Sequence, residues 1–176
     1  MTKKRTLIIL ACALLAMAGL AQAQSATGTT TLSVTVGPEA SLTVTNGTTT
    51  LATAGTVFNA YTGTTNLAYK IRTTKSTGSG TVVLEVTTDF AGAGGPSVGT
   101  PPTAGDALTY TCTVTGTGTA CSAQTASHSA TTPVVNFGAG AGSSTSTAAV
   151  AWSLTNDPVY ATGTYTATTT FTIAST

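Results

Sequence analysis

The sequence has few residues that carry charge or polar chemistry. Of its 176 residues, 6 are Lys or Arg, 5 are Asp or Glu, one is His and one is Trp. An active site gathers several ionisable groups, so this scarcity argues against catalysis, and we expect no enzyme activity. Strong helix formers are also scarce, whereas 45 residues are Thr and 19 are Gly, which suit strands and turns. The composition therefore argues against a helical fold.

Low charge does not indicate disorder in this chain. Disordered segments combine few apolar residues with many charges, whereas this sequence is 41% apolar and 6% charged. That is enough apolar material for a core, and the length fits one domain.

The N-terminus has the pattern of an export signal. Lys3-Lys4-Arg5 gives a basic start, residues 7–20 form an apolar stretch, and Ala21-Gln22-Ala23 is a small-x-small cleavage site. We expect residues 1–23 to be a signal peptide and residues 24–176 to be a single domain. No later run approaches the roughly twenty apolar residues of a membrane span. The sequence therefore predicts a secreted protein that passes through the periplasm to the cell surface or beyond, with no membrane span.

Without the leader, the charge balance is slightly acidic. Three cations remain, Lys70, Arg72 and Lys75, against five scattered acids, which gives a side-chain charge of about −2. Nucleic-acid binding requires a larger cluster of cations, so we exclude it. One His, two Cys and scattered acids do not supply a zinc or calcium site, and no motif suggests a phosphate cradle. We expect no metal and no cofactor.

Cysteine usage agrees with export. Cys12 lies in the leader, and the remaining pair is Cys112 and Cys121. An even pair in an oxidising compartment predicts a disulfide. Closing so short a loop contributes about 2.5 kcal/mol on the chain-entropy model.

The main sequence periodicity is two, which indicates strands with one apolar face. Strands with alternating apolar residues are expected at 31–36, 40–44, 67–72, 82–86, 108–114, 134–137, 150–154 and 165–173. Asn46-Gly47 is a strong hairpin signal, and residues 91–105 form a long loop rich in Gly and Pro. About eight or nine such strands predict an all-β, antiparallel β-sandwich of immunoglobulin-like topology. A closed β-barrel remains the alternative, since periodicity does not distinguish the two.

The outward faces of these strands carry mostly Thr and few charges. Exposed sheet edges are usually protected from pairing with other molecules by Lys, Pro or bulges. Their scarcity leaves the edges free to join another strand.

We considered several residues as candidate sites. His128 between Ser127 and Ser129 lacks the sequence context of a hydrolytic triad, and we expect a loop residue. Glu85 and Asp89 form the closest pair of acids, but their spacing suits an exposed rim better than a glycosidase. Trp152 alternates with apolar neighbours and should point inward. Tyr61 and Tyr160 lie in or beside loops, where an exposed ring would suit sugar binding.

The two ends of the chain after the leader look alike. The segment Gly28 to Val36 and the segment Gly163 to Ile173 both open with Gly-Thr and then alternate. In this respect the sequence resembles chaperone/usher pilins and spore coat protein U, subunits of secreted bacterial fibres whose last strand often reads Gly-x-Tyr-x-x-x-x-x-aromatic. Gly163, Tyr165, Phe171 and Ile173 match that strand.

The resemblance implies a mode of assembly. In that family each subunit lacks one strand, and the N-terminal extension of the next subunit fills the groove. Residues 27–36 would be the donor, within a possible donor or edge strand at 24–36, with Thr30, Leu32, Val34 and Val36 in its alternating pattern. Implied partners are copies of itself or related subunits, a periplasmic chaperone and an outer-membrane usher. The alternative is that this strand pairs within its own sandwich.

The sequence thus predicts a non-catalytic secreted structural protein, a subunit of a fimbria-like fibre or surface coat. The alternative function is a secreted carbohydrate-binding or adhesive module. A glycan screen and an assembly assay distinguish these two classes.

Overall fold

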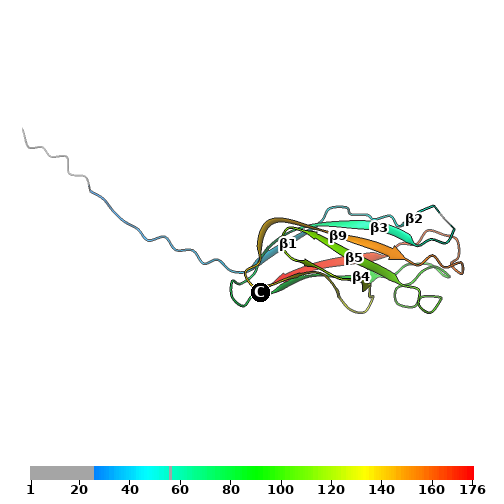
Figure 1. Cartoon of the computed structure of the whole chain (residues 1–176). Helices are drawn as coiled ribbons and strands as arrows, with labels where there is room; N and C mark the ends of the chain where they lie inside the picture. Colours follow the sequence, from blue (N-terminus) through cyan, green and yellow to red (C-terminus); the bar gives the residue numbers. More distant parts are fainter. Residues whose placement is uncertain (1–25, 56) are drawn as a thin grey trace, which may run out of the picture. The chain divides into compact units, whose positions relative to one another are not determined.

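The computed structural model describes residues 26–55 and 57–176, and their regular structure is entirely β (Figure 1). Residues 1–23, the predicted signal peptide, lie outside the described residues. Ten antiparallel strands form two sheets. Sheet A contains β1 (Glu39–Val44), β2 (Ala52–Thr53), β3 (Tyr61–Arg72), β9 (Gly142–Leu154), β5 (Leu108–Thr115) and β7 (Gln124–Thr125). Sheet B contains β10 (Thr168–Ser175), β4 (Gly80–Thr88), β8 (Thr132–Phe137) and β6 (Thr119–Ala120).

The sheets form a sandwich, which confirms the first of the two predicted architectures. The strand order is β1-β3-β9-β5-β7 in sheet A, with β2 beside β3, and β10-β4-β8-β6 in sheet B. Each sheet has free edges, so the barrel alternative is wrong. By contact, the chain divides into a folded body, Val36–Thr176, and the part before it, of which residues 26–35 are described. No helix among the described residues is long and apolar enough to cross a bilayer.

The core lies between the inward faces of the long strands. Alternate residues of β3, β4 and β9 are almost fully buried: Leu67, Tyr69, Ile71, Val82, Leu84, Val86, Val150, Trp152 and Leu154. These rows confirm the predicted inward faces, including that of Trp152, whose indole Nε1 donates to Thr65 Oγ1 at 2.8 Å. Burying such side chains stabilises by about 1.5 to 3 kcal/mol each, which is why the period of two decides the fold.

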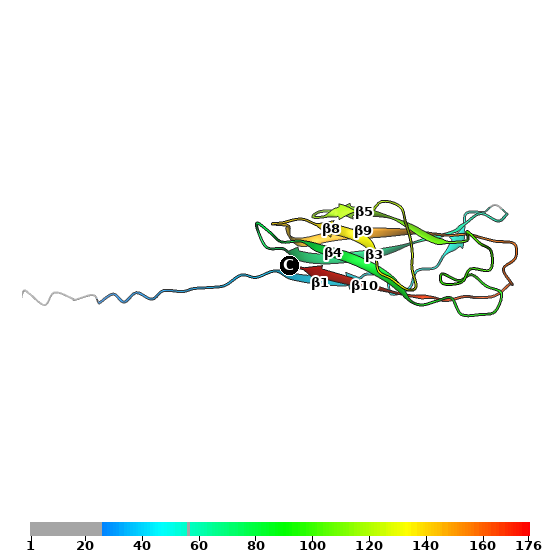
Figure 2. The same cartoon turned by 90° about the horizontal axis from the view of Figure 1, so that it is seen from below.

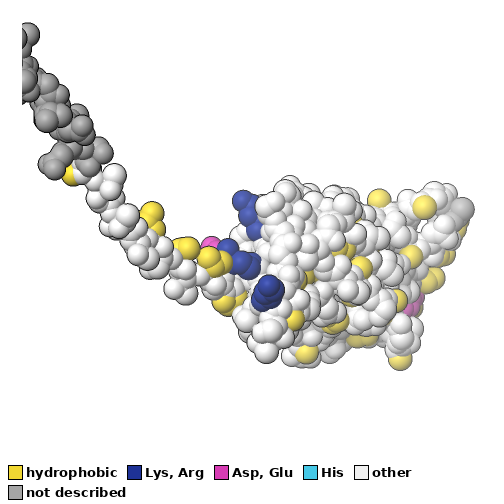
Figure 3. Space-filling view, turned by 60° about the vertical axis from the view of Figure 1, so that its left-hand side comes forward, with side chains coloured by type: hydrophobic (Ala, Val, Ile, Leu, Met, Phe, Trp, Pro, Cys, Tyr) yellow, Lys and Arg dark blue, Asp and Glu magenta, His cyan; other side chains and the backbone are white. Residues whose placement is uncertain are grey.

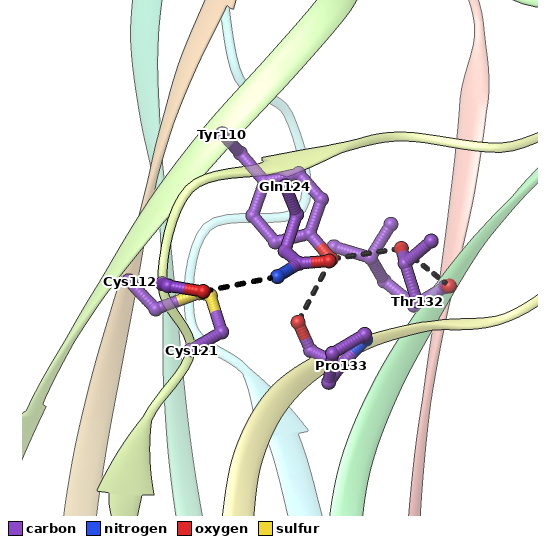
Figure 4. Close-up of a disulfide and its surroundings, with 8 residues drawn as sticks. Tyr110, Cys112, Cys121, Gln124, Thr132 and Pro133 are labelled. Atoms are coloured by element: carbon purple, nitrogen blue, oxygen red, sulfur yellow. Dashed lines mark hydrogen bonds between the residues drawn. A yellow bond between two sulfur atoms is a disulfide. The ribbon is translucent and has the colours of Figure 1, made fainter.

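The predicted disulfide is present and joins the two sheets (Figure 4). Cys112 lies in β5 of sheet A, and Cys121 follows β6 of sheet B, with 5.4 Å between their Cα atoms. Gly116 and Gly118 between them have φ of +103° and +118°, a region that glycine enters without a steric penalty. Nearby, the Tyr110 hydroxyl lies 2.8 Å from the Pro133 carbonyl oxygen in β8. β5 is thus tied to sheet B by covalent and polar links.

The hairpin predicted at Asn46-Gly47 is wrong. β1 and β2 lie along the same edge of β3, one after the other, instead of pairing with each other. The Asn46 side chain spans the break between them, because its Nδ2 donates to the Thr64 carbonyl at 3.0 Å and its Oδ1 accepts from Asn66 N–H at 2.6 Å. The asparagine that suggested a turn therefore bonds to the neighbouring strand.

Two predicted strands also differ from the structure. Residues 31–36 alternate, but none of the described residues 26–38 belongs to a strand. The last strand begins at Thr168 and not at Tyr165. The ring of Tyr165 lies where a Cβ on Gly92 or Gly95 would be, so this part of the chain packs against the 91–99 loop before β10 starts.

Candidate functional site

One side of the sandwich is open. β1 is the edge strand of sheet A, and β10 is the edge strand of sheet B. The two strands are not paired with each other, but they lie close together on the same side of the body (Figure 2). Their two unpaired edges therefore run alongside each other, and we call this side the open edge.

The core is incompletely covered along the open edge. Ala40 and Leu42 of β1, and Phe171 and Ile173 of β10, pack against the core but remain half-buried. Their partners one strand further in are fully buried, since Leu42 lies opposite Tyr69 and Phe171 opposite Leu84. A strand added along this side would bury more of these four side chains.

The opposite side of the sandwich is closed. The chain between β5 and β8 supplies an edge strand to each sheet, β6 to sheet B and β7 to sheet A. The Cys112–Cys121 disulfide joins the sheets at that place. Both edge strands there have two residues, which is one of the ways in which proteins limit unwanted pairing. The open edge is therefore a specific feature of one side.

The strand order identifies what the open edge lacks. In an immunoglobulin constant-type domain one sheet has the order A-B-E-D and the other C-F-G. β1, β3, β9 and β5 take the places of A, B, E and D, while β4 and β10 take those of C and F. No strand of the described chain takes the place of G, which would lie beside β10.

The residues before β1 have the pattern of a strand but no strand partner. Leu32, Val34 and Val36 are 91%, 84% and 63% exposed. Thr30, the fourth residue of the pattern, is exposed as well. Large apolar side chains alternating with Ser and Thr suit a strand with one buried face, and here that face is exposed.

The predicted C-terminal strand residues fall into two groups. Phe171 and Ile173 lie in β10 and face the core. Gly163 and Tyr165 precede β10, and the Tyr165 hydroxyl donates to the Ala161 carbonyl at 2.8 Å. At the other end, Thr176 N–H donates to the Ser79 carbonyl at 2.8 Å. β10 is thus held at both ends while its outer edge stays unpaired.

The residues considered for catalysis hold loops. Asp89 accepts hydrogen bonds from Ser97 Oγ and from the N–H groups of Phe90, Val98 and Gly99. His128 lies in a loop, as expected, with its Nδ1 2.7 Å from the Val86 carbonyl oxygen. No three His, Cys, Asp or Glu side chains gather in the described part of the chain in a way that could hold a metal ion.

The aromatic residues considered for sugar binding are also engaged. Tyr160 donates to Asp106 Oδ2 at 2.8 Å. Burial, followed by this bond and the nearby carboxylates Asp106 and Asp157, raises the pKa of Tyr160. Tyr61 opens β3 and is half-buried. Tyr160 follows the Asp157-Pro158 turn and is half-buried.

Comparisons with known proteins give no match, whether to a protein-family model, to a curated protein or to a solved structure. The alternating pattern predicts the two strands of the open edge, but their position side by side is a contact between distant parts of the chain.

Proposed function

We propose that this protein is a non-catalytic, secreted structural subunit of an extracellular fimbria-like fibre or surface coat. Copies join by β-strand addition, in which residues 27–36 of one copy enter the open edge of another. The main support is the open edge itself, where two unpaired strands leave a half-buried apolar row. Strand addition provides main-chain hydrogen bonds along the edge and pockets for alternate side chains.

The donor segment and the open edge have similar lengths and the same apolar alternation. Ten donor residues in extended conformation span about 33 Å, and the eight residues of β10 span about 26 Å. Leu32, Val34 and Val36 recur at every second position, as do Phe171 and Ile173. Moving each apolar donor side chain from water onto the apolar row of the open edge contributes about 1.5 to 3 kcal/mol to binding.

The linker favours donation between copies over insertion into the same molecule. Gly37 and Pro38 alone separate Val36 from β1. A two-residue hairpin would need a positive φ at both positions for a type I′ turn, or at Gly37 for a type II′ turn. Pro38 is fixed near −65°, and Gly37 has no positive φ. The segment therefore suits a neighbour better than β1 of its own chain.

The proposed export partners would also act at the open edge. A periplasmic chaperone would cover the open edge before assembly, and an outer-membrane usher would receive the subunits. The alternative function, a carbohydrate-binding module, depends on exposed aromatic rings. It gains no support from Trp152, which lies in the core, or from Tyr160, which is half-buried and bonded to Asp106.

The experiment uses two variants of the full chain that carry the same added charge. Leu32→Asp with Val34→Asp places two carboxylates on the apolar face of the donor, where burial would be costly. We expect this variant to stay monomeric in size-exclusion chromatography and electron microscopy. The control, Ser33→Asp with Thr35→Asp, changes the outward face of the same segment and should still assemble. Equal assembly of the two variants would contradict strand addition.

A further inference from the structure

The cations of the folded body gather at one end. Lys70 and Arg72 lie at the end of β3, and Lys75 lies in the turn that follows; all three are exposed. Figure 3 shows the Lys and Arg side chains together at this end of the body. Glu39 pairs with Arg72, with 2.8 Å between Oε2 and Nη2, so the side chains here sum to +2. We call this the basic end.

The acids gather at the opposite end of the strands. Asp89 follows β4, Asp106 precedes β5, and Asp157 follows β9. In sheet A these strand ends coincide, because Leu154 at the end of β9 lies opposite both Tyr61 and Leu108, the first residues of β3 and β5. β4 ends at the same end, since Val86 N–H donates to the Ser127 carbonyl and the neighbouring Ala126 N–H donates to the Leu108 carbonyl. The three carboxylates sum to −3, and we call this the acidic end. The remaining acid, Glu85, lies within β4 opposite Thr170.

The two ends are too far apart to neutralise each other. From Tyr61 to Arg72 the chain is extended, and eleven steps of about 3.3 Å give a separation of about 36 Å. Salt screens charges over about 8 Å at physiological ionic strength. Each end therefore presents its charge to other molecules and not to the rest of its own body.

The acidic end also exposes apolar side chains, and the basic end is hollowed. At the acidic end, Val57, Phe58 and Val159 are 85%, 56% and 66% exposed. Their two loops are joined, since Asn156 Nδ2 donates to the Asn59 carbonyl at 3.0 Å. At the basic end, an open recess of about 380 Å³ is lined by residues that include Lys70, Arg72 and Ser143. Apolar groups rimmed by charge are typical of surfaces that contact another protein.

We propose that the acidic end of one copy docks onto the basic end of the next copy of this chain. The opposite charges are the complementary parts of this contact, and the exposed apolar residues of the acidic end would face the recess of the basic end. The inference builds on the proposed assembly by strand addition, because it names the surface that the joined copies share and the direction in which they join.

The contact selects the orientation of the donor. β1 runs away from the basic end, since Glu39 lies opposite Arg72 and Val44 opposite Leu67, while β10 runs the other way, from Thr88 to Gly80 of β4. A donor segment that runs parallel to β1 of the acceptor copy leaves the open edge at the acceptor's acidic end. Gly37-Pro38 then leads directly into the basic end of the donor copy. The reverse orientation brings two basic ends together, which like-charge repulsion disfavours.

The test measures the assembly rate of the full chain, expressed with its leader, by light scattering at low and high salt. Lys70→Thr with Lys75→Thr removes two charges from the basic end. Thr111→Glu with Thr113→Glu changes the net charge by the same amount on the exposed outer face of β5, away from both ends. We expect the first variant to assemble about tenfold more slowly than wild type at low salt, and the control to assemble within about twofold of it.

A charge exchange gives a second arm. Lys70→Glu with Lys75→Glu should block assembly at low salt, and adding Asp106→Lys and Asp157→Lys to the same chain should restore it. Assembly that is independent of salt and of all these charges would overturn the end-to-end contact while leaving strand addition intact. A wild-type chain that stays monomeric at every salt concentration would overturn both proposals.

Discussion

At the scale of single residues, the side chains of Asp89 and His128 hold loops in place. Asp89 is the clearest case, because four donors converge on its carboxylate. Burial by itself would raise the pKa of Asp89, but the bonds from Ser97, Val98, Gly99 and Phe90 outweigh it and hold the pKa below its usual 3.8. The charged form is therefore part of the folded structure of the 91–99 loop.

Substitution of Asp89 tests this role. We expect Asp89→Asn to lower the free energy of unfolding by about 1 to 3 kcal/mol at pH 7, because the amide replaces one acceptor oxygen with a donor. Since the folded pKa lies below the unfolded one, the carboxylate stabilises above about pH 4, and its contribution is lost as the pH falls through the folded pKa. Urea unfolding at pH 7 and about pH 2 should show the difference between the two proteins shrinking.

A matched control removes the same charge from β4. Glu85→Gln should change the free energy of unfolding by less than about 0.5 kcal/mol at pH 7. A variant at Asp89 that is as stable as this control would show that the loop does not depend on the carboxylate.

At the scale of elements, the two sides of the sandwich differ in how their edge strands are protected. The short strands β6 and β7 and the disulfide close one side, whereas β1 and β10 leave the other side unpaired. β10 is nevertheless fixed in place, since Tyr165 packs against the 91–99 loop and Thr176 bonds to Ser79. An edge that is ordered but unpaired is a ready template for a strand from another molecule.

The disulfide on the closed side should stabilise the folded protein. Replacing Cys112 and Cys121 by Ala should lower the free energy of unfolding by about 2.5 kcal/mol, because the unfolded chain gains freedom. A reductant should lower the stability of the wild type by a similar amount and have no effect on the variant in the same urea titration. Equal unfolding midpoints for wild type and variant would show that the crosslink does not stabilise the fold.

At the scale of the whole molecule, the body should be foldable but incomplete without a donor. We expect a chain lacking residues 24–36 to fold, to remain monomeric and to bind a peptide of that sequence. At a peptide concentration about 100 times Kd, binding contributes about 2.7 kcal/mol, which raises Tm by about 5 to 10 °C. Differential scanning calorimetry measures this shift.

The control peptide carries Asp at positions 32 and 34 in place of Leu and Val. It should leave Tm unchanged, because burying a carboxylate against the apolar row of the open edge is unfavourable. A deletion variant that assembles as well as the full chain, or whose Tm neither peptide changes, would contradict the proposed assembly.

Much of the fold follows from local pattern. The alternation in β3, β4, β5 and β9 predicts their inward rows, and the cysteine pair predicts the disulfide, because burial and chain closure act on these residues wherever their partners lie. The two-residue strands β2, β6 and β7 were not predicted, since two residues carry no period. The hairpin predicted at Asn46-Gly47 does not form, because the Asn46 side chain bonds to β3, twenty residues away in the chain.

The sequence by itself determined the fold class, the inward faces and the crosslink, since a period of two admits only pleated strands that bury one face. Only the tertiary structure decided which strands are neighbours. It places β1 and β10 side by side with no strand between them, and it separates the charges onto opposite ends. Strand order and the end at which each strand starts depend on contacts between distant parts of the chain, and those contacts leave no local pattern in the sequence.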